Sequence, residues 1–113
     1  MLSQANRLKK NKDFEQVFKK GRGFKDGPLL LRLVKNNLMV SRFAFSVGLK
    51  VSKKAVVRNK IRRRLQEAVR ADLTEVKTGF DLVFTALPGI ESQNYQEIKE
   101  RAERLLKKAG LLP

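Results

Sequence analysis

The segment from Lys53 to Arg64 is strongly basic: seven of its twelve residues are Lys or Arg, and none is acidic. Like charges three and four residues apart repel on a helix, so this density costs stability unless an anion neutralises it. Arginine outnumbers lysine from Arg58 onward, which suits bidentate contact with phosphate. Most charge runs are solvated helix faces, but such faces carry interleaved carboxylates, which this segment lacks. The segment therefore predicts a surface that binds a polyanion.

The whole chain of 113 residues carries the same signal, with 26 Lys and Arg against 11 Asp and Glu and a net charge of +15. Twenty of the basic residues precede Ala71, so the polyanion site is expected within the first 70 residues. This surplus indicates nucleic acid as first partner and an acidic membrane surface as second. No apolar run approaches the roughly 20 residues that span a bilayer, and the first residues are too polar for a signal peptide. We expect a cytoplasmic protein with no membrane partner.

The residue types argue against catalysis by the protein alone. The chain has no His and no Cys, the commonest general base near neutral pH and the usual zinc ligands. An autonomous metal-dependent nuclease would need clustered carboxylates. The candidates are Asp81 beside a strand and three glutamates, which helix solubility explains better: Glu97, Glu100 and Glu103. We therefore expect no catalytic residue and no metal site on the protein.

Two aromatic residues, Phe14 and Phe18, lie four residues apart on a helix that Asn11 is expected to cap and Gly21 to end. A pair at this spacing more often faces the core than a ligand. The alternative is an exposed aromatic wall, on which unpaired bases stack.

The clearest strand pattern runs from Phe43 to Ser52. One face carries large apolar residues, of which the first three are assigned to the core: Phe43, Phe45, Val47, Leu49 and Val51. The other face is small and polar: Ala44, Ser46, Gly48, Lys50 and Ser52. Such a strand packs its apolar face against helices and leaves its polar face open to solvent or a ligand.

The remaining elements complete one α+β domain over residues 1–113. Strands are expected near Phe24, over 29–35 and over 80–86. A helix over 53–72 buries an apolar stripe, composed of Val57, Ile61, Leu65, Ala68 and Val69. A last helix begins at a capping box of Asn94 and Glu97 and ends at Gly110.

Four pieces of the chain, in order, resemble the protein subunit of bacterial ribonuclease P. The most specific is the run Arg58-Asn59-Lys60-Ile61-Arg62-Arg63-Arg64-Leu65, which resembles the "RNR" signature of that family. The others are the opening helix from Arg7 to Gly21, the run Val51-Ser52-Lys53-Lys54, and the strand Phe80–Phe84 with Pro88-Gly89. The connection from Lys54 to Ala55 is shorter than is usual in the family, which is expected to rotate the start of the basic helix or extend it.

The resemblance implies a division of labour between RNA and protein. In the family, a catalytic RNA removes the 5′ leader of precursor tRNA with magnesium ions, which the RNA mainly binds. The protein binds both that RNA and the leader, in a holoenzyme expected to hold one protein and one RNA. The resemblance also implies a left-handed crossover between the central strand, the basic helix and the last strand, against the usual right-handed rule.

The resemblance assigns roles to particular residues. The catalytic RNA would contact the basic helix through Arg58, Asn59, Lys60, Arg62, Arg63 and Arg64. The leader would lie in a cleft between the first helix and the polar face of the sheet, lined by Phe14, Phe18, Lys50 and Ser52. Peripheral basic residues would attract leader or tRNA: Arg7, Lys9, Lys10, Lys12, Lys53 and Lys54. A competing hypothesis is a structural or regulatory RNA-binding protein of ribosomal type, which composition alone does not separate from the first.

Overall fold

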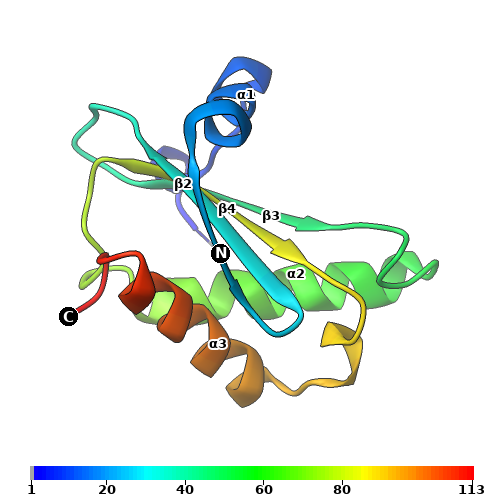
Figure 1. Cartoon of the computed structure of the whole chain (residues 1–113). Helices are drawn as coiled ribbons and strands as arrows, with labels where there is room; N and C mark the ends of the chain where they lie inside the picture. The colour runs from blue at the N-terminus through cyan, green and yellow to red at the C-terminus, as the bar shows by residue number, and fades with distance from the viewer. Residues whose placement is uncertain (1) are drawn as a thin grey trace.

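Four strands form one mixed sheet in the computed structural model, which describes residues 2–113 (Figure 1). The strands are β1 (Arg22–Asp26), β2 (Leu29–Lys35), β3 (Arg42–Val47) and β4 (Phe80–Ala86). The helices are α1 (Asn11–Lys20), α2 (Ala55–Ala71) and α3 (Tyr95–Lys108), with short 3-10 helices η1 (Gln4–Asn6) and η2 (Ile90–Ser92). The strand order is β1-β2-β4-β3, and only β3 and β4 are parallel. The predicted α+β fold is confirmed.

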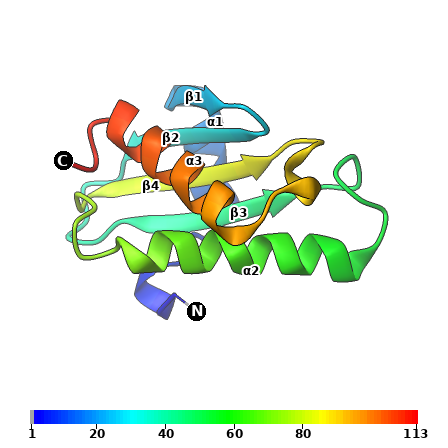
Figure 2. The same cartoon turned by 90° about the horizontal axis from the view of Figure 1, so that it is seen from below.

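The helices divide between the two faces of the sheet. Helices α2 and α3 pack on each other across one face, and α1 lies on the opposite face against β2 and β4 (Figures 1 and 2). None of the helices within residues 2–113 is long and apolar enough to cross a membrane.

The crossover from β3 through α2 to β4 is left-handed. In Figure 2, both strands run toward the right, α2 lies in front of the sheet, and β4 lies above β3. With the strands turned to point upward and α2 still in front, β4 therefore lies to the left of β3. A right-handed connection would place it to the right. The handedness expected from the family resemblance is confirmed.

The main core fills the space between the sheet and the helices α2 and α3. Alternate residues of the central strands point into it, including the fully buried Leu31 and Phe84. Each helix contributes a stripe at helical spacing, as predicted for α2, where Ile61, Leu65, Ala68 and Val69 are buried. The ring of Phe45 stacks on that of Phe84 with centroids 5.9 Å apart. Burial of this stripe turns the basic residues of α2 outward.

A smaller core lies on the other face of the sheet, under α1. Its buried members are Leu8, Val17 and Val83, and Phe14 packs against them. Helix α1 ends where Gly21 passes close to two carbonyl groups, those of Val17 and Leu33. A β-carbon at residue 21 would collide with the Val17 oxygen, so this approach of helix to strand requires glycine.

The strand predicted to run as far as Ser52 ends at Val47. In the parallel register Val47 pairs with Ala86, the last residue of β4, so no partner strand continues beyond it. The chain turns instead, and the Val51 amide donates to the Gly48 carbonyl at 3.1 Å. Leu49, which alternation placed on the apolar face of the strand, is 68% exposed, whereas Val51 on the same predicted face is buried.

Of the two helix caps predicted from the sequence, the cap of α3 is present in the structure and that of α1 is not. The capping box of α3 is confirmed: the Glu97 amide donates to Asn94 Oδ1 at 2.9 Å, and the Asn94 amide donates to Glu97 Oε1 at 3.0 Å. Asn11 is not the cap of α1, because the helix already includes it and Lys10 occupies the cap position without a side-chain hydrogen bond. Helix α2 begins directly at Ala55, with Lys54 at its cap position.

Candidate nucleic-acid interface

The outward arc of α2 presents the basic residues of the signature. Asn59, Lys60 and Arg63 are exposed, and Arg58, Arg62 and Arg64 are half-buried at the margins of the helix. Because the apolar stripe of α2 is buried on the sheet and α3, all six side chains reach solvent on the same helix. The helix thus displays a continuous cationic surface.

Three of these arginines are held by backbone carbonyls. Arg58 Nη1 donates to the Ser52 oxygen at 3.0 Å, Arg62 Nη2 to the Val47 oxygen at 3.3 Å, and Arg64 Nη1 to the Gln93 oxygen at 2.9 Å. A carbonyl orients a guanidinium and leaves its full positive charge in place.

No ion pair within residues 2–113 joins a carboxylate to a signature arginine. Among the ion pairs that residues 2–113 form, α2 contributes one, between Arg70 and Glu67 at 3.7 Å, and it lies beyond the signature. The remaining pairs involve β1, β3, β4, α1 and α3. The signature arginines are therefore positioned for an external anion and not neutralised within the described chain.

The two phenylalanines of α1 occupy different environments. Phe14 is half-buried and packs on the small core under α1, whereas Phe18 is 50% exposed. Both line a shallow cavity of about 430 Å³ along α1, with Asn11, Glu15 and Lys19. Phe14 therefore packs partly into the core under α1 and borders the cavity, whereas half of the Phe18 side chain is exposed to solvent.

Lys50 and Ser52 do not join this aromatic wall. Both follow the end of β3, in the connection to α2, and Figure 1 shows that connection far from α1. The Ser52 hydroxyl accepts a hydrogen bond from the Lys54 amide at 3.1 Å, and its carbonyl accepts one from Arg58. Their predicted place on the polar face of the sheet is wrong, because that prediction extended the strand beyond the end of its partner. Ser52 instead organises the start of α2.

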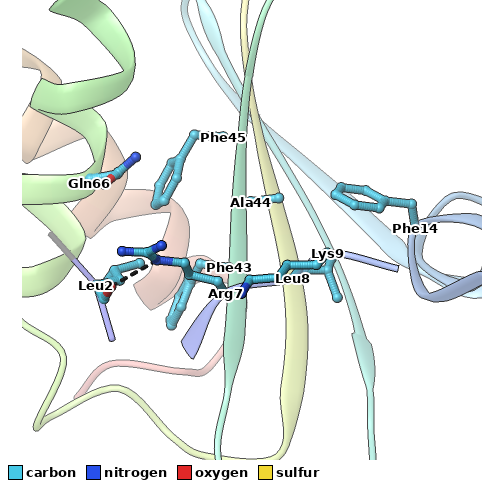
Figure 3. A pocket seen from close by; sticks show the side chains of 9 residues that line it. All are labelled: Leu2, Arg7, Leu8, Lys9, Phe14, Phe43, Ala44, Phe45 and Gln66. Carbon is cyan, nitrogen blue, oxygen red and sulfur yellow. Dashed lines mark hydrogen bonds between the residues drawn. The ribbon is translucent and has the colours of Figure 1, made fainter. Parts of the chain in front are cut away.

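The peripheral basic residues lie on two segments. Lys9, Lys10 and Lys12 are exposed before and on α1, and Lys53 and Lys54 are exposed before α2. Arg7 is half-buried and donates through Nε to the Leu2 carbonyl at 2.9 Å. It lines a cavity of about 380 Å³ that wraps around the edge of β3, with Phe45 and Gln66 on one side and Phe14 on the other (Figure 3).

One cationic residue near α1 was missed from the sequence. Arg32 of β2 lies beneath the end of α1, where its Nη2 donates to the carbonyls of Phe18 at 2.9 Å and Gly21 at 3.3 Å. Its Nε is buried and has no hydrogen-bond partner in the described chain. The sequence signal that could have identified it is that Arg32 is the one charged residue within the apolar run 29–34 of β2. Its position shows which face of β2 is turned toward α1.

The carboxylates considered for a nuclease are engaged in structural contacts. Asp81 is 3% exposed and accepts two hydrogen bonds from Arg42, at 2.8 and 2.7 Å, and one from Asn36 at 2.8 Å. The pKa of Arg42 is raised, chiefly by this bond to Asp81. Arg42 also reaches Asp13 of α1 at 3.3 Å, so the network ties α1 to the sheet.

The glutamates of α3 likewise form structural hydrogen bonds or ion pairs. Glu97 belongs to the capping box, Glu100 accepts from Gln96 at 3.3 Å, and Glu103 pairs with Lys99 at 3.3 Å. Residues 2–113 contain no group of three or more acidic side chains placed to hold a metal ion. The carboxylates of residues 2–113 considered above therefore do not form a donor set for a magnesium ion.

The chain is similar over nearly its whole length to proteins of one kind. The family model described as Ribonuclease P matches residues 2–110. The Ribonuclease P protein component of Alkaliphilus metalliredigens is 37% identical over 111 residues, which cover 98% of this chain and 99% of that relative. The protein of the same name from Clostridium kluyveri is 41% identical over 107 residues, covering 93% and 95%.

Solved structures agree with these relatives in fold. A Staphylococcus aureus RNase P protein, a mutant with defective mRNA degradation activity, superposes with a TM-score of 0.90 at 27% identity, covering 96% of this chain and 92% of that one. The Thermotoga maritima RNase P protein, in complex with 1-(4-fluorophenyl)-2-thiourea, gives a TM-score of 0.83 at 28% identity, covering 90% and 98%. With a family match that spans the described domain and full-length relatives above 30% identity, this chain belongs to the ribonuclease P protein component family.

Proposed function

We propose that this protein is the subunit of a ribonuclease P holoenzyme that binds the catalytic RNA through the basic face of α2. The observation that carries the proposal is the set of oriented but unneutralised signature arginines, of which Arg58, Arg62 and Arg64 are held by carbonyls. Arginines in this state can neutralise RNA phosphates, and binding is favoured because the cations condensed on the RNA are then released. Family membership supports the RNA of ribonuclease P as the partner and favours this role over a ribosomal one.

The second part of the proposal concerns the 5′ leader of precursor tRNA. The exposed ring of Phe18, with Phe14 beside it, is suited to stacking on unpaired bases without regard to sequence. Arg32 adds a positive charge against the Phe18 ring, which would attract the phosphates of a bound strand. Peripheral lysines around α1 would attract the leader or the tRNA body.

The chemical step is assigned to the RNA. The protein has no histidine and no cysteine, and the carboxylates considered for a nuclease are engaged in structural contacts, so its proposed contribution is binding and orientation of the precursor. We propose that magnesium is bound mainly by the RNA, where it assists endonucleolytic removal of the leader. The holoenzyme would contain one protein and one RNA and would mature tRNA 5′ ends in the cytoplasm.

Reconstitution tests this function directly. The full chain is mixed with a bacterial ribonuclease P RNA and a precursor tRNA at a magnesium concentration too low for the RNA alone to cleave efficiently. Cleavage at the mature 5′ end, stimulated by the protein, is the expected result. Lack of stimulation would contradict the proposal, and cleavage by the protein without RNA would overturn the assignment of catalysis to the RNA.

A further inference from the structure

An aromatic side chain borders the basic face of α2 on the side of α3. Tyr95, the first residue of α3, is 36% exposed. It lines an open cavity of about 560 Å³ together with Lys60, Arg63, Arg64 and Glu67. Three cations against one carboxylate give this groove a positive balance. Within residues 2–113 the phenol hydroxyl makes no hydrogen bond, and no cation of these residues lies over the ring.

The groove is built from fixed parts. The capping box of Asn94 and Glu97 sets the start of α3 and therefore the position of Tyr95. Arg64 donates to the Gln93 carbonyl at 2.9 Å, which ties α2 to the residues just before that cap. The capping box occupies the amides of Asn94 and Glu97, and the cationic side chains that line the groove come from α2.

We propose that Tyr95 stacks on an unpaired base of the RNA bound by α2, while Lys60 and Arg63 hold the adjoining phosphates. The inference rests on the proposed function and adds to it. Lysine and arginine on a helix bind the backbone of duplex and single strand alike. An aromatic ring gains stacking energy only from a base that has left its duplex. The groove between α2 and α3 therefore selects a bulged or single-stranded nucleotide at this point of the RNA.

The composition of the chain supplies a direct probe of this contact. Tyr95 is the one tyrosine of the sequence, and there is no tryptophan, so intrinsic fluorescence reports on this side chain alone. The full chain is titrated with a single-stranded RNA oligonucleotide and, separately, with an RNA duplex of equal length. Binding is followed independently by the anisotropy of a fluorescein-labelled strand. Free N-acetyltyrosinamide, titrated in parallel, corrects for light absorbed by the RNA.

Saturable quenching by the single strand, larger than that by the duplex at equal occupancy, is the expected result. Binding by anisotropy with tyrosine fluorescence unchanged overturns the inference and leaves the proposed function intact. No RNA binding by anisotropy at low salt would count against the proposed function itself.

Variants of Tyr95 separate stacking from packing. Tyr95→Phe keeps the ring and should retain single-strand affinity. Tyr95→Leu keeps an apolar side chain without a π face and should reduce that affinity roughly tenfold, with an unchanged salt dependence. Equal weakening of single-strand and duplex binding by Tyr95→Leu contradicts the inference. Circular dichroism checks the fold of each variant, and should Tyr95→Leu unfold, the fluorescence of the unmodified protein decides the matter.

Discussion

The guanidinium of Arg32 lies over the ring of Phe18, with its Cζ 5.9 Å from the ring centroid, and donates a hydrogen bond to the carbonyl of the same residue. This pair of interactions joins the last turn of α1 to β2. It holds Phe18 in place while half of the side chain stays exposed. In the proposed function, this positioned ring would stack on a base of the single-stranded leader, with the Arg32 cation against its other face.

Replacing Phe18 should affect binding far more than stability. Phe18→Ala removes an exposed ring, so the free energy of unfolding should fall by at most about 1 kcal/mol, the value of its interaction with Arg32. In the holoenzyme, affinity for precursor tRNA should fall by about 1–3 kcal/mol, with affinity for mature tRNA unchanged. Equilibrium binding of the two tRNAs measures the difference. Leu49→Ala, which removes another exposed apolar side chain, is the matched control, and equal weakening of both tRNAs would exclude stacking on the leader.

Replacing Phe14 should affect both properties. The residue packs on the core under α1 and lines the cavity shared with Phe18. Phe14→Ala should therefore destabilise the fold by about 2 kcal/mol, less than for a fully buried phenylalanine. It should also weaken precursor binding more than mature tRNA binding, without gross unfolding. Urea unfolding together with the same binding assay checks this, and a decrease in stability with no selective effect on binding would assign Phe14 to the core alone.

The signature arginines should set the salt dependence of RNA binding. Replacing Arg58, Arg62 and Arg63 together by Ala should reduce the slope of log K against log salt by up to about 0.9 for each duplex phosphate that these residues no longer neutralise. A filter-binding series from low to moderate salt measures the slope. Replacing Lys77, Lys107 and Lys108, three exposed cations of the final third, should leave it nearly unchanged. The same slope in both variants would contradict the assignment of α2.

Asp26 should stabilise the protein in a pH-dependent manner. Its carboxylate accepts hydrogen bonds from Arg104 at 2.8 Å and Arg101 at 2.7 Å, and the bond from Arg104 is the main cause of its lowered pKa. This stabilisation is present above the unfolded-state pKa of about 3.9 and is lost as pH falls through the lower pKa of the folded state. Asp26→Asn should cost about 1–2 kcal/mol at pH 7, and less in acid. Urea unfolding of both proteins between acid pH and pH 7 measures the difference in their free energies of unfolding. A difference that does not change with pH would refute the contribution assigned to the ionised Asp26 carboxylate.

Asp72, unlike Asp26, should destabilise the protein when its carboxylate is ionised. Burial, and next the neighbouring Glu103, raise the pKa of Asp72, and its Oδ2 is buried without a hydrogen-bond partner in the described chain. The ionised form therefore destabilises the fold at neutral pH, and stability is regained as pH falls through the raised pKa. Asp72→Asn supplies an amide donor and should stabilise the protein by on the order of 1 kcal/mol at pH 7. Thermal unfolding at pH 7 and pH 4 tests this, and a stabilisation that persists unchanged at pH 4 would contradict it.

Local patterns predicted most of the elements correctly. The apolar stripe from Ile61 to Val69 and the capping box at Asn94 depend on residues within one or two turns of helix, so sequence spacing is enough to find them. The density of arginine from Arg58 to Arg64 likewise identifies an anion-binding helix face without knowledge of the fold.

The candidate cleft was predicted less completely, because its composition depends on where strands end. Alternation continues in the sequence to Ser52, but a strand exists only while a neighbour pairs with it, and β4 stops at Ala86. Because β3 ends with its partner, Lys50 and Ser52 lie in the connection before α2 and not in the predicted cleft. The contribution of Arg32 depends on α1 lying across β2, which no local pattern encodes.

The sequence by itself thus determined the class of fold, the cationic helix and the absence of histidine and cysteine, because these are properties of composition and short-range spacing. Tertiary structure alone decided which acceptors orient Arg58, Arg62 and Arg64, which phenylalanine of α1 stays open, and that Tyr95 lies beside the basic helix. Each of these arrangements joins residues of different elements, or depends on how one element packs on another. Their geometry follows from strand register and helix packing, which act between segments distant in the chain.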